Sequence, residues 1–320
     1  MILVEDNQKP TNYIYTYSYH EDEFSLCQLE MRSFFGFDTK SSKLESPIQI
    51  DPSRSPFIKE RIGVLCEADS LDELERKVAN LPIIKQTFKV MFISTSDQPK
   101  KQKVVFEERR AIERKIGVQL KGKVDLRVPE RLFAITKVNE CWIFGELIVS
   151  EALWFKHQKK PHNYSTALST RVARAVVNIA VPNPKGIKVI DPCCGIGTVL
   201  IEALSMGIDI IGSDLNPLIL SGTRENIAYF GFSTKVTKGD IRNVTDHFDV
   251  AIIDMPYNLC SVLAPEEQLE MLSSAGNFAK RVVVVTVESI DHLIEAAGFK
   301  IIDRCVAKKS MFSREVIVCE

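Results

Sequence analysis

The sequence contains no apolar run of the roughly 18–20 residues needed to span a bilayer. Residues 1–6 turn acidic too early for a signal peptide, so we expect a cytoplasmic protein without a membrane segment. None of the eight cysteines forms a Cys-x-x-Cys pair, and the vicinal Cys193 and Cys194 cannot easily form an unstrained disulfide. Neither a disulfide framework nor a structural zinc site is supported, and no metal is expected.

The net charge of −1 hides an uneven distribution of charge. Residues 1–81 carry 9 basic and 15 acidic side chains (−6), residues 82–188 carry 21 and 9 (+12), and residues 189–320 carry 11 and 18 (−7). A solvated, lysine-rich surface is one interpretation of the basic middle block, and phosphate binding is the other. The candidate phosphate-binding residues in this block are Arg109, Arg110, Lys115, Lys121 and Lys123.

The C-terminal half alternates short apolar strands with helices. Strands are predicted at 188–190, 209–212, 235–237, 250–253, 281–287, from 301 and at 315–318. Helices are predicted at 198–206, 216–230, 266–279 and 290–297, the second opened by Asn216 as N-cap. The alternation predicts an α/β, mostly parallel, doubly wound sheet with its ligand at the carboxyl ends of the strands.

The N-terminal half has a less regular pattern and predicts an α+β region. Strands are expected at 13–17, 132–136 and 141–149, and helices at 25–35, 71–81 and 107–116. The polar and basic stretch 156–164 is predicted to be a linker, in which His157 and His162 are surface residues.

A glycine-containing loop lies between the first strand and first helix of the predicted sheet, at 191–198. Gly195 and Gly197 let a ligand approach the backbone beside the free N–H groups of the following helix. Asp214 ends the second strand, where a carboxylate can bind ribose hydroxyls, and Asp240 ends the third. The dinucleotide fingerprint needs a third glycine where Leu200 stands, which disfavours pyrophosphate and therefore an oxidoreductase.

This loop resembles the S-adenosylmethionine loop of class I methyltransferases. In that family one acidic residue precedes the glycines, a second binds the ribose and a third lies near the adenine amine, positions that Asp191, Asp214 and Asp240 match. The resemblance implies S-adenosylmethionine as cofactor. The cofactor-binding residues it implies are Thr166, Leu168, Asp191, Cys193, Gly195, Gly197, Thr198, Asp214, Leu215, Asp240 and Ile241.

A second motif, Asp254-Met255-Pro256-Tyr257, stands at the end of the fourth predicted strand. It resembles the [D/N]-P-P-Y motif of amino-group methyltransferases, with Met255 in place of the first proline. Asp254 and the Met255 carbonyl can accept hydrogen bonds from a weakly nucleophilic exocyclic amine, and Tyr257 can stack on a base. Asp254, Pro256 and Tyr257 are therefore the candidate catalytic residues.

Methylation of a pyrimidine at C5 would need a cysteine nucleophile. Tyr257, not cysteine, follows Pro256, and Cys193, Cys194 and Cys260 are predicted to be small buried hydrophobic residues.

Residues 165–180 resemble the segment that folds over the cofactor in THUMP-containing tRNA methyltransferases. Residues 123–130 are similar to the end of a THUMP domain, and the opening strand and helix resemble its ferredoxin-like companion. The chain then divides into four segments. These are a ferredoxin-like region (1–55), a THUMP-like RNA-binding domain (56–155), a linker with the cofactor-covering segment (156–183) and a class I, Rossmann-like methyltransferase domain (184–320).

The family with this arrangement includes guanine-N2 methyltransferases of tRNA. The resemblance implies that the N-terminal domains hold the tRNA acceptor stem while the C-terminal domain modifies a nucleotide in the tRNA body. The candidate phosphate-binding residues of the basic block would then be RNA-binding residues. No obligate protein partner is evident. Two alternatives stay open: adenine-N6 methylation of RNA or DNA, and a non-catalytic RNA-binding protein on a methyltransferase scaffold.

Overall fold

The computed structural model describes residues 10–39, 41–94, 105–258, 261–309 and 312–320. The chain forms two compact units. The first comprises Met1–Ser18, Thr39–Ser53 and Phe57–Glu151, and the second comprises Tyr19–Asp38, Arg54–Pro56 and Ala152–Glu320. Each is described by itself.

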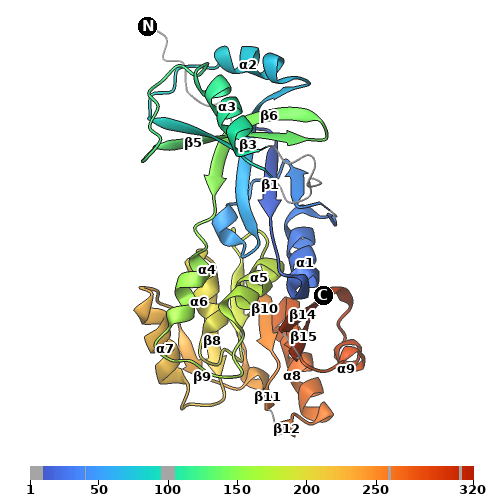
Figure 1. Cartoon of the computed structure of the whole chain (residues 1–320). Coiled ribbons are helices and arrows are strands. Elements are labelled where there is room, and N and C mark those ends of the chain that lie inside the picture. The colour runs from blue at the N-terminus through green and yellow to red at the C-terminus, as the bar shows by residue number, and fades with distance from the viewer. Residues whose placement is uncertain (1–9, 40, 95–104, 259–260, 310–311) are drawn as a thin grey trace. The chain divides into compact units, whose positions relative to one another are not determined.

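The first unit contains a six-stranded sheet (Figure 1). Its strands are β1 (Tyr13–Tyr17), β2 (Lys43–Ser46), β3 (Ile58–Ala68), β4 (Phe88–Phe92), β5 (Arg131–Val138) and β6 (Cys141–Val149), in the order β2-β1-β3-β6-β5-β4. All neighbours are antiparallel except the parallel pair β4–β5. Asn139 and Glu140 have the positive φ of a tight two-residue turn, which joins the antiparallel strands β5 and β6 in a hairpin.

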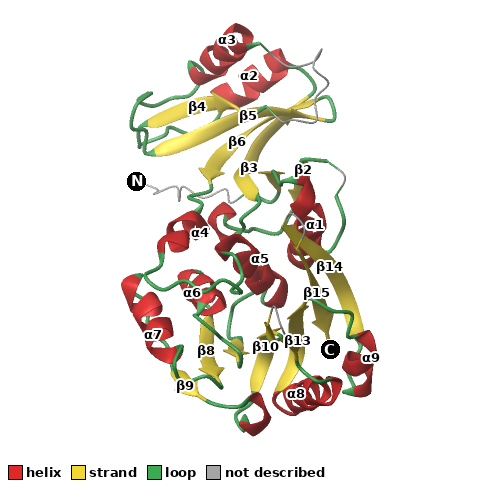
Figure 2. Ribbon diagram, turned by 60° about the horizontal axis from the view of Figure 1, so that its bottom comes forward, coloured by secondary structure: helices red, strands yellow, loops and turns green. Residues whose placement is uncertain are grey.

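Two helices pack on this sheet, α2 (Leu71–Ala79) and α3 (Phe106–Gly117). Both elements were predicted, and Ser70 caps α2 by accepting a hydrogen bond from the Glu73 N–H. Their apolar faces lie against strand residues such as Phe88 and Phe133. Figure 2 shows both helices on the same face of the sheet.

The second unit contains a seven-stranded sheet with the order β14-β15-β13-β10-β7-β8-β9. Its strands are β7 (Lys188–Asp191), β8 (Asp209–Asp214), β9 (Val236–Lys238), β10 (Phe248–Asp254), β13 (Ala279–Thr286), β14 (Ile301–Lys309) and β15 (Phe312–Cys319). Strands β7 to β10 and β13 are parallel, whereas β15 is antiparallel to β13 and β14. This is the predicted doubly wound sheet. The direction of strand addition reverses beside β7, where β8 lies on one side and β10 on the other, and such a switch point favours a ligand site.

Helices cover both faces of the second sheet. They are α1 (Phe24–Phe35), α4 (Leu153–Lys156), α5 (Thr170–Ala180), α6 (Thr198–Ser205), α7 (Leu220–Tyr229), α8 (Pro265–Phe278) and α9 (Asp291–Ala296). Ala251 and Val282 pack with α8 and α9, so Ile252 and Val283 point to the opposite face, where α5 contacts β10 and β13. Among the described residues, no helix is both long and apolar enough to cross a membrane.

Shorter elements complete the chain. Single 3₁₀ turns occupy Glu21–Glu23, Pro52–Arg54, His157–Lys159 and Ile241–Asn243. Strands β11 (Tyr257–Asn258) and β12 (Ser261–Val262) form a small antiparallel pair after β10.

Several sequence predictions need correction. Helix α7 begins at Leu220 rather than at Asn216, because the Asn216 side chain accepts a hydrogen bond from the Leu218 N–H and closes a separate turn. His157 is buried, not at the surface. Its polar ring is accommodated in the interior because Nδ1 lies within hydrogen-bond distance, 2.8 Å, of the buried Glu202 Oε1. His162 is partly exposed beside Glu225, as predicted.

The predicted boundary between residues 55 and 56 does not coincide with a division of the structure. Strands β1 and β2 share a sheet with β3 to β6, whereas α1 belongs to the second unit. There the Arg32 guanidinium pairs with Asp303 of β14 (2.8 Å) and Asn178 Nδ2 donates to Glu30 Oε1 (2.7 Å). The ferredoxin-like and THUMP assignments remain predictions.

Candidate active site

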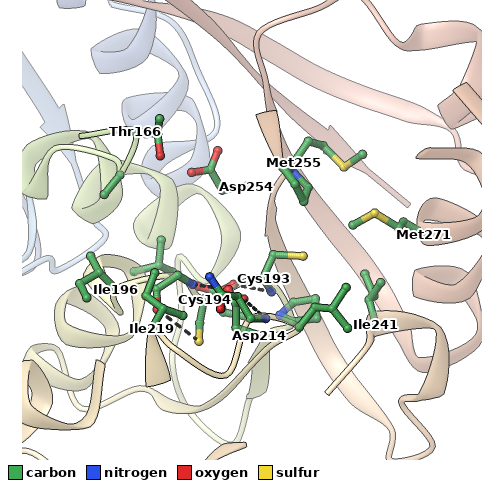
Figure 3. Close-up of a pocket in the computed structure, with 18 of the residues that line it drawn as sticks. Thr166, Cys193, Cys194, Ile196, Asp214, Ile219, Ile241, Asp254, Met255 and Met271 are labelled. Carbon is green, nitrogen blue, oxygen red and sulfur yellow. Dashed lines mark hydrogen bonds between the residues drawn. The ribbon is translucent and has the colours of Figure 1, made fainter. Parts of the chain in front are cut away.

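A cavity of about 670 Å³ opens at the carboxyl ends of β7, β8 and β10 in the second unit. Figure 3 shows side chains from separate strands and loops converging on it. The predicted cofactor-binding residues that line the cavity are Thr166, Leu168, Asp191, Cys193, Gly195, Thr198, Asp214, Leu215, Asp240 and Ile241. Gly197 does not line it. Predicted residues from four chain segments therefore meet where the strand order predicts a ligand.

The two loop glycines have different roles. Gly195 (φ +50°) lines the cavity, and a Cβ added there would meet no atom within 4 Å, so its missing side chain leaves cavity space open. Gly197 (φ +82°) caps α6, and a Cβ there would lie 2.9 Å from Thr223 Cγ2. Gly197 shapes the turn and allows close packing, but it is not part of the cavity wall.

Asp191 is the most deeply buried acid of the cavity, with 3% of its surface exposed. Its Oδ1 accepts a hydrogen bond from the Cys193 N–H at 3.2 Å. Burial raises the pKa of Asp191 well above its usual range, and the charges of Asp254 and Asp214 raise it further. A positively charged ligand group in this cavity would therefore stabilise the ionised carboxylates.

Asp214 and Asp240 each hold neighbouring backbone. Asp214 accepts from the N–H groups of Gly195 (2.8 Å) and Asn216 (2.9 Å), one on each oxygen, so each oxygen keeps a lone pair for a further donor. Asp240 is paired with the Arg242 guanidinium at 2.7 Å, which lowers the pKa of its carboxyl. Any ligand donor that reaches Asp240 must share this carboxylate with Arg242.

Asp254 ends β10 with an unpaired carboxyl oxygen. Its Oδ1 is buried and has no hydrogen-bond partner among the described residues, and the side chain lines the cavity. Burial raises the pKa of Asp254 to about 7, opposed by the positive charge of Arg314. An unsatisfied buried acceptor is costly, so it marks a position prepared for a donor.

The substituted position of the tetrapeptide has a structural explanation. The Met255 N–H donates to the Val285 carbonyl at 2.8 Å and thereby extends the pairing of β10 with β13, a bond that proline could not make. The Met255 side chain is buried and packs in the same core as Met271 of α8, and Figure 3 shows the two side chains close together at the cavity. Pro256 is exposed and lines the cavity. The Tyr257 side chain lies outside the described part of the structure.

Three functional neighbours were missed by the sequence analysis. Arg314 of β15 donates to the Thr166 carbonyl at 2.9 Å, tying the predicted covering segment to the sheet. Met271 lines the cavity from α8. Lys160 donates to Thr198 Oγ1 at 3.0 Å. No local sequence pattern identifies these residues, because each contact joins segments that are distant in sequence. For Arg314, the sequence shows only that a basic residue flanks an apolar strand.

The predicted RNA-binding residues lie in the first unit. Arg109, Arg110 and Lys115 are on α3, and Lys115 forms ion pairs with Asp72 (2.5 Å) and Glu75 (3.3 Å). Exposed Lys121 and Lys123 follow α3. The charge of Lys115 is therefore partly offset, whereas Lys121 and Lys123 are directed to solvent.

The cysteines beside the cavity are poor nucleophiles. Burial raises the thiol pKa of both Cys193 and Cys194 far above its usual value, and the nearby aspartates raise it further. Cys260 lies outside the described residues. Within the described part of the chain, no group of three or more His, Cys, Asp or Glu is arranged to hold a metal ion.

Comparison with known families identifies the domain that contains this cavity. Residues 157–289 match the family model described as UPF0020, RMKL-like, methyltransferase domain. Together with the strand order of the second sheet, this match shows the class I, Rossmann-like methyltransferase fold, whose cofactor is S-adenosylmethionine. The expected cofactor chemistry and fold class are thereby confirmed.

Two similar curated proteins are named tRNA (guanine(10)-N2)-dimethyltransferase. The one from Methanothermobacter thermautotrophicus is 28% identical over 221 residues, 66% of this chain and 63% of that protein. The one from Pyrococcus abyssi is 28% identical over 198 residues, 57% of this chain and 59% of that protein. The matched segments therefore span about three fifths of the relatives' length.

Among solved structures, TrmN from Thermus thermophilus is similar over 97% of this chain and 99% of its own, with a TM-score of 0.47 and 19% identity. At this score the likeness carries no functional argument. The fold assignment rests on the family model and the strand order.

Proposed function

We propose that this protein is an S-adenosylmethionine-dependent RNA methyltransferase. Its acceptor is an exocyclic amine of tRNA, the N2 amine of a guanine. The observation that carries the proposal is the Asp254 Oδ1 atom, a buried, unpaired acceptor in the same cavity as the 191–198 loop. An amine presented there would satisfy the acceptor while lying in reach of the cofactor's cavity.

The cavity residues fit the cofactor. Asp191, Asp214 and Asp240 place carboxylates around an opening of about 670 Å³, and Gly195 leaves one wall without a side chain. Asp214 would bind the ribose hydroxyls of the cofactor, and Asp240 and Ile241 would contact its adenine. Asp191 would lie near the positively charged end of the cofactor. When bound, S-adenosylmethionine supplies a methyl group on a positively charged sulfur.

In the proposed mechanism Asp254 orients the acceptor amine. The amine of a base is weakly nucleophilic because its lone pair is delocalised into the ring, and a hydrogen bond to Asp254 favours the attacking geometry and the positive charge that develops on nitrogen. Methyl transfer would form the bond between the amine nitrogen and the methyl carbon and break the bond between that carbon and sulfur, whose electron pair would stay on sulfur as a neutral thioether. The amine would lose one proton, which Asp254, with a pKa of about 7, can accept. Tyr257 would stack on the base turned toward the cavity.

The choice of tRNA guanine N2 is supported by the names of the two curated relatives. It is also supported by the predicted THUMP-like region and by the exposed lysines Lys121 and Lys123 of the first unit. This proposal has three parts. They are the methyltransferase activity, the binding of RNA by the first unit, and action of the protein in the cytoplasm.

The direct test is methyl transfer to unmodified bulk tRNA from labelled S-adenosylmethionine, followed by nucleoside mass spectrometry. We expect N2-methylated guanosine from the wild-type protein and none from Asp254→Ala. Asp246→Ala, a change at an exposed acid outside the cavity, is the matched control and should retain activity.

Other results would change the assignment. Formation of N6-methyladenosine would overturn the guanine acceptor and leave the mechanism in place. Cofactor binding without transfer to any RNA would favour a non-catalytic RNA-binding protein.

A further inference from the structure

A buried lysine lies behind the cofactor loop. Only 8% of Lys160 is exposed, and its Nζ donates to Thr198 Oγ1 at 3.0 Å. Lysine is almost never this deeply buried unless a partner compensates its charge. The sequence predicts a polar linker at residues 156–164, and the burial of Lys160 corrects that prediction at this position.

Lys160 has no carboxylate in ion-pair contact among the residues that the structure describes. The acid that acts on it most strongly is Glu202, and both oxygens of Glu202 are already used. Oε2 lies 2.7 Å from Arg174 Nη1, and Oε1 lies 2.8 Å from His157 Nδ1. Burial lowers the pKa of Lys160, so its ammonium form is stabilised if an anion approaches.

Thr198 connects Lys160 to the cavity. It is the first residue of the eight-residue helix α6, it is 5% exposed, and it lines the cavity. Because its oxygen accepts the Lys160 hydrogen bond, its own hydroxyl hydrogen is available to another acceptor. The positive end of the α6 dipole lies at the same place.

The buried ammonium, the hydroxyl hydrogen and the helix N-terminus all favour negative charge at one end of the cavity. The methionine part of the cofactor carries a single carboxylate, which has the charge and the acceptor atoms required. We propose that Lys160 is a positioning residue that holds the cofactor carboxylate through the Thr198 hydroxyl. This inference rests on the cofactor of the proposed function and is independent of the RNA acceptor.

The test compares two ligands by isothermal titration calorimetry without RNA. S-adenosylhomocysteine retains the carboxylate, whereas 5′-methylthioadenosine keeps the adenosine and sulfur and lacks the amino-acid end. Lys160→Met should bind S-adenosylhomocysteine about tenfold more weakly, the order of a charge-assisted hydrogen bond, with unchanged affinity for methylthioadenosine. Lys159→Met, at the exposed neighbouring lysine, is the control and should change neither.

Substitutions at Thr198 test whether Lys160 acts through its hydroxyl. Thr198→Val should show the same selective loss, and Thr198→Ser should bind as the wild type does. The double variant Lys160→Met/Thr198→Val should lose little more than either single variant, because both changes remove one interaction.

Two outcomes overturn the inference alone: a Lys160→Met protein with wild-type affinity for S-adenosylhomocysteine, or equal losses for both ligands, which would indicate general distortion. A wild-type protein that binds neither ligand would overturn the cofactor assignment together with the inference. The wild-type titration therefore separates the two failures.

Discussion

Asp254 gives a prediction in which stability and activity change in opposite directions. Its carboxyl has a pKa of about 7 in the folded protein, compared with 3.8 for an aspartate that is not buried. Between these values the folded state keeps a proton that the unfolded state releases, so the contribution of Asp254 to stability falls as pH rises from about 4 to 7. A difference of about 3 pH units corresponds to at most about 4 kcal/mol.

Asp254→Asn removes this pH-dependent cost because an amide does not ionise. We expect the variant to be inactive and yet more stable than the wild type at pH 8, by several degrees in Tm for a unit of this size. At pH 4 the two proteins should differ little. Glu30 also has a raised pKa, but it is present in both proteins, so its effect cancels in the comparison. The Asp254 charge raises the pKa of Asp191, so its removal also relieves part of the cost of ionising Asp191 and changes stability in the same direction.

The measurement is thermal unfolding by circular dichroism at pH 4, 6 and 8, with Asp246→Asn as the exposed-acid control. A Tm difference between variant and wild type that is the same at every pH would refute the reasoning. So would a variant that is less stable than the wild type at pH 8, since the unpaired buried charge would then not be the source of the cost.

Three further predictions follow from described contacts. Alanine in place of three of the four basic residues of α3, Arg109, Arg110 and Lys115, should weaken tRNA binding and leave cofactor affinity unchanged. Unaltered retention of tRNA at moderate salt would refute their placement. Arg174→Met leaves the buried Glu202 carboxylate without its guanidinium partner and should cost about 3–5 kcal/mol in urea unfolding. Met255→Pro removes the N–H that bonds to the Val285 carbonyl and should cost about 1–3 kcal/mol; equal stability would show that this bond is dispensable.

The sequence predicts the second sheet and the cavity well because their determinants are local. The glycine loop marks the end of the first strand, and an acidic residue marks the end of each later strand. Because the carboxyl ends of parallel strands lie at one edge of the sheet, the sequence predicts that Asp191, Asp214 and Asp254 lie near one another. The place of Gly195 in the cavity wall is likewise predicted from the sequence, because a glycine in the loop after the first strand lets a ligand approach the backbone. These features need only nearby residues and the general rule for parallel sheets.

The remaining contacts depend on segments far apart in sequence. Burial of Lys160 and His157 follows from their partners on α6, about 40 residues away, and polar composition alone suggested a linker. Arg314 reaches Thr166 across almost half the chain. The start of α7 was mispredicted because an asparagine side chain can either cap a helix or close a separate turn. At Asn216 it closes the turn.

The position of α1 has a consequence for how a catalytic fragment could be produced. The second unit consists of three chain segments, because residues 19–38 and 54–56 belong to it together with everything from Ala152 onward. A fragment beginning at residue 152 would lose the helix that covers β14 and would leave Asn178 of α5 without its Glu30 partner. The linear boundary of the family match at residue 157 therefore does not coincide with the boundary of the structural unit. A fragment that preserves the contacts of the second unit would have to include the N-terminal helix, supplied in cis or as a separate peptide.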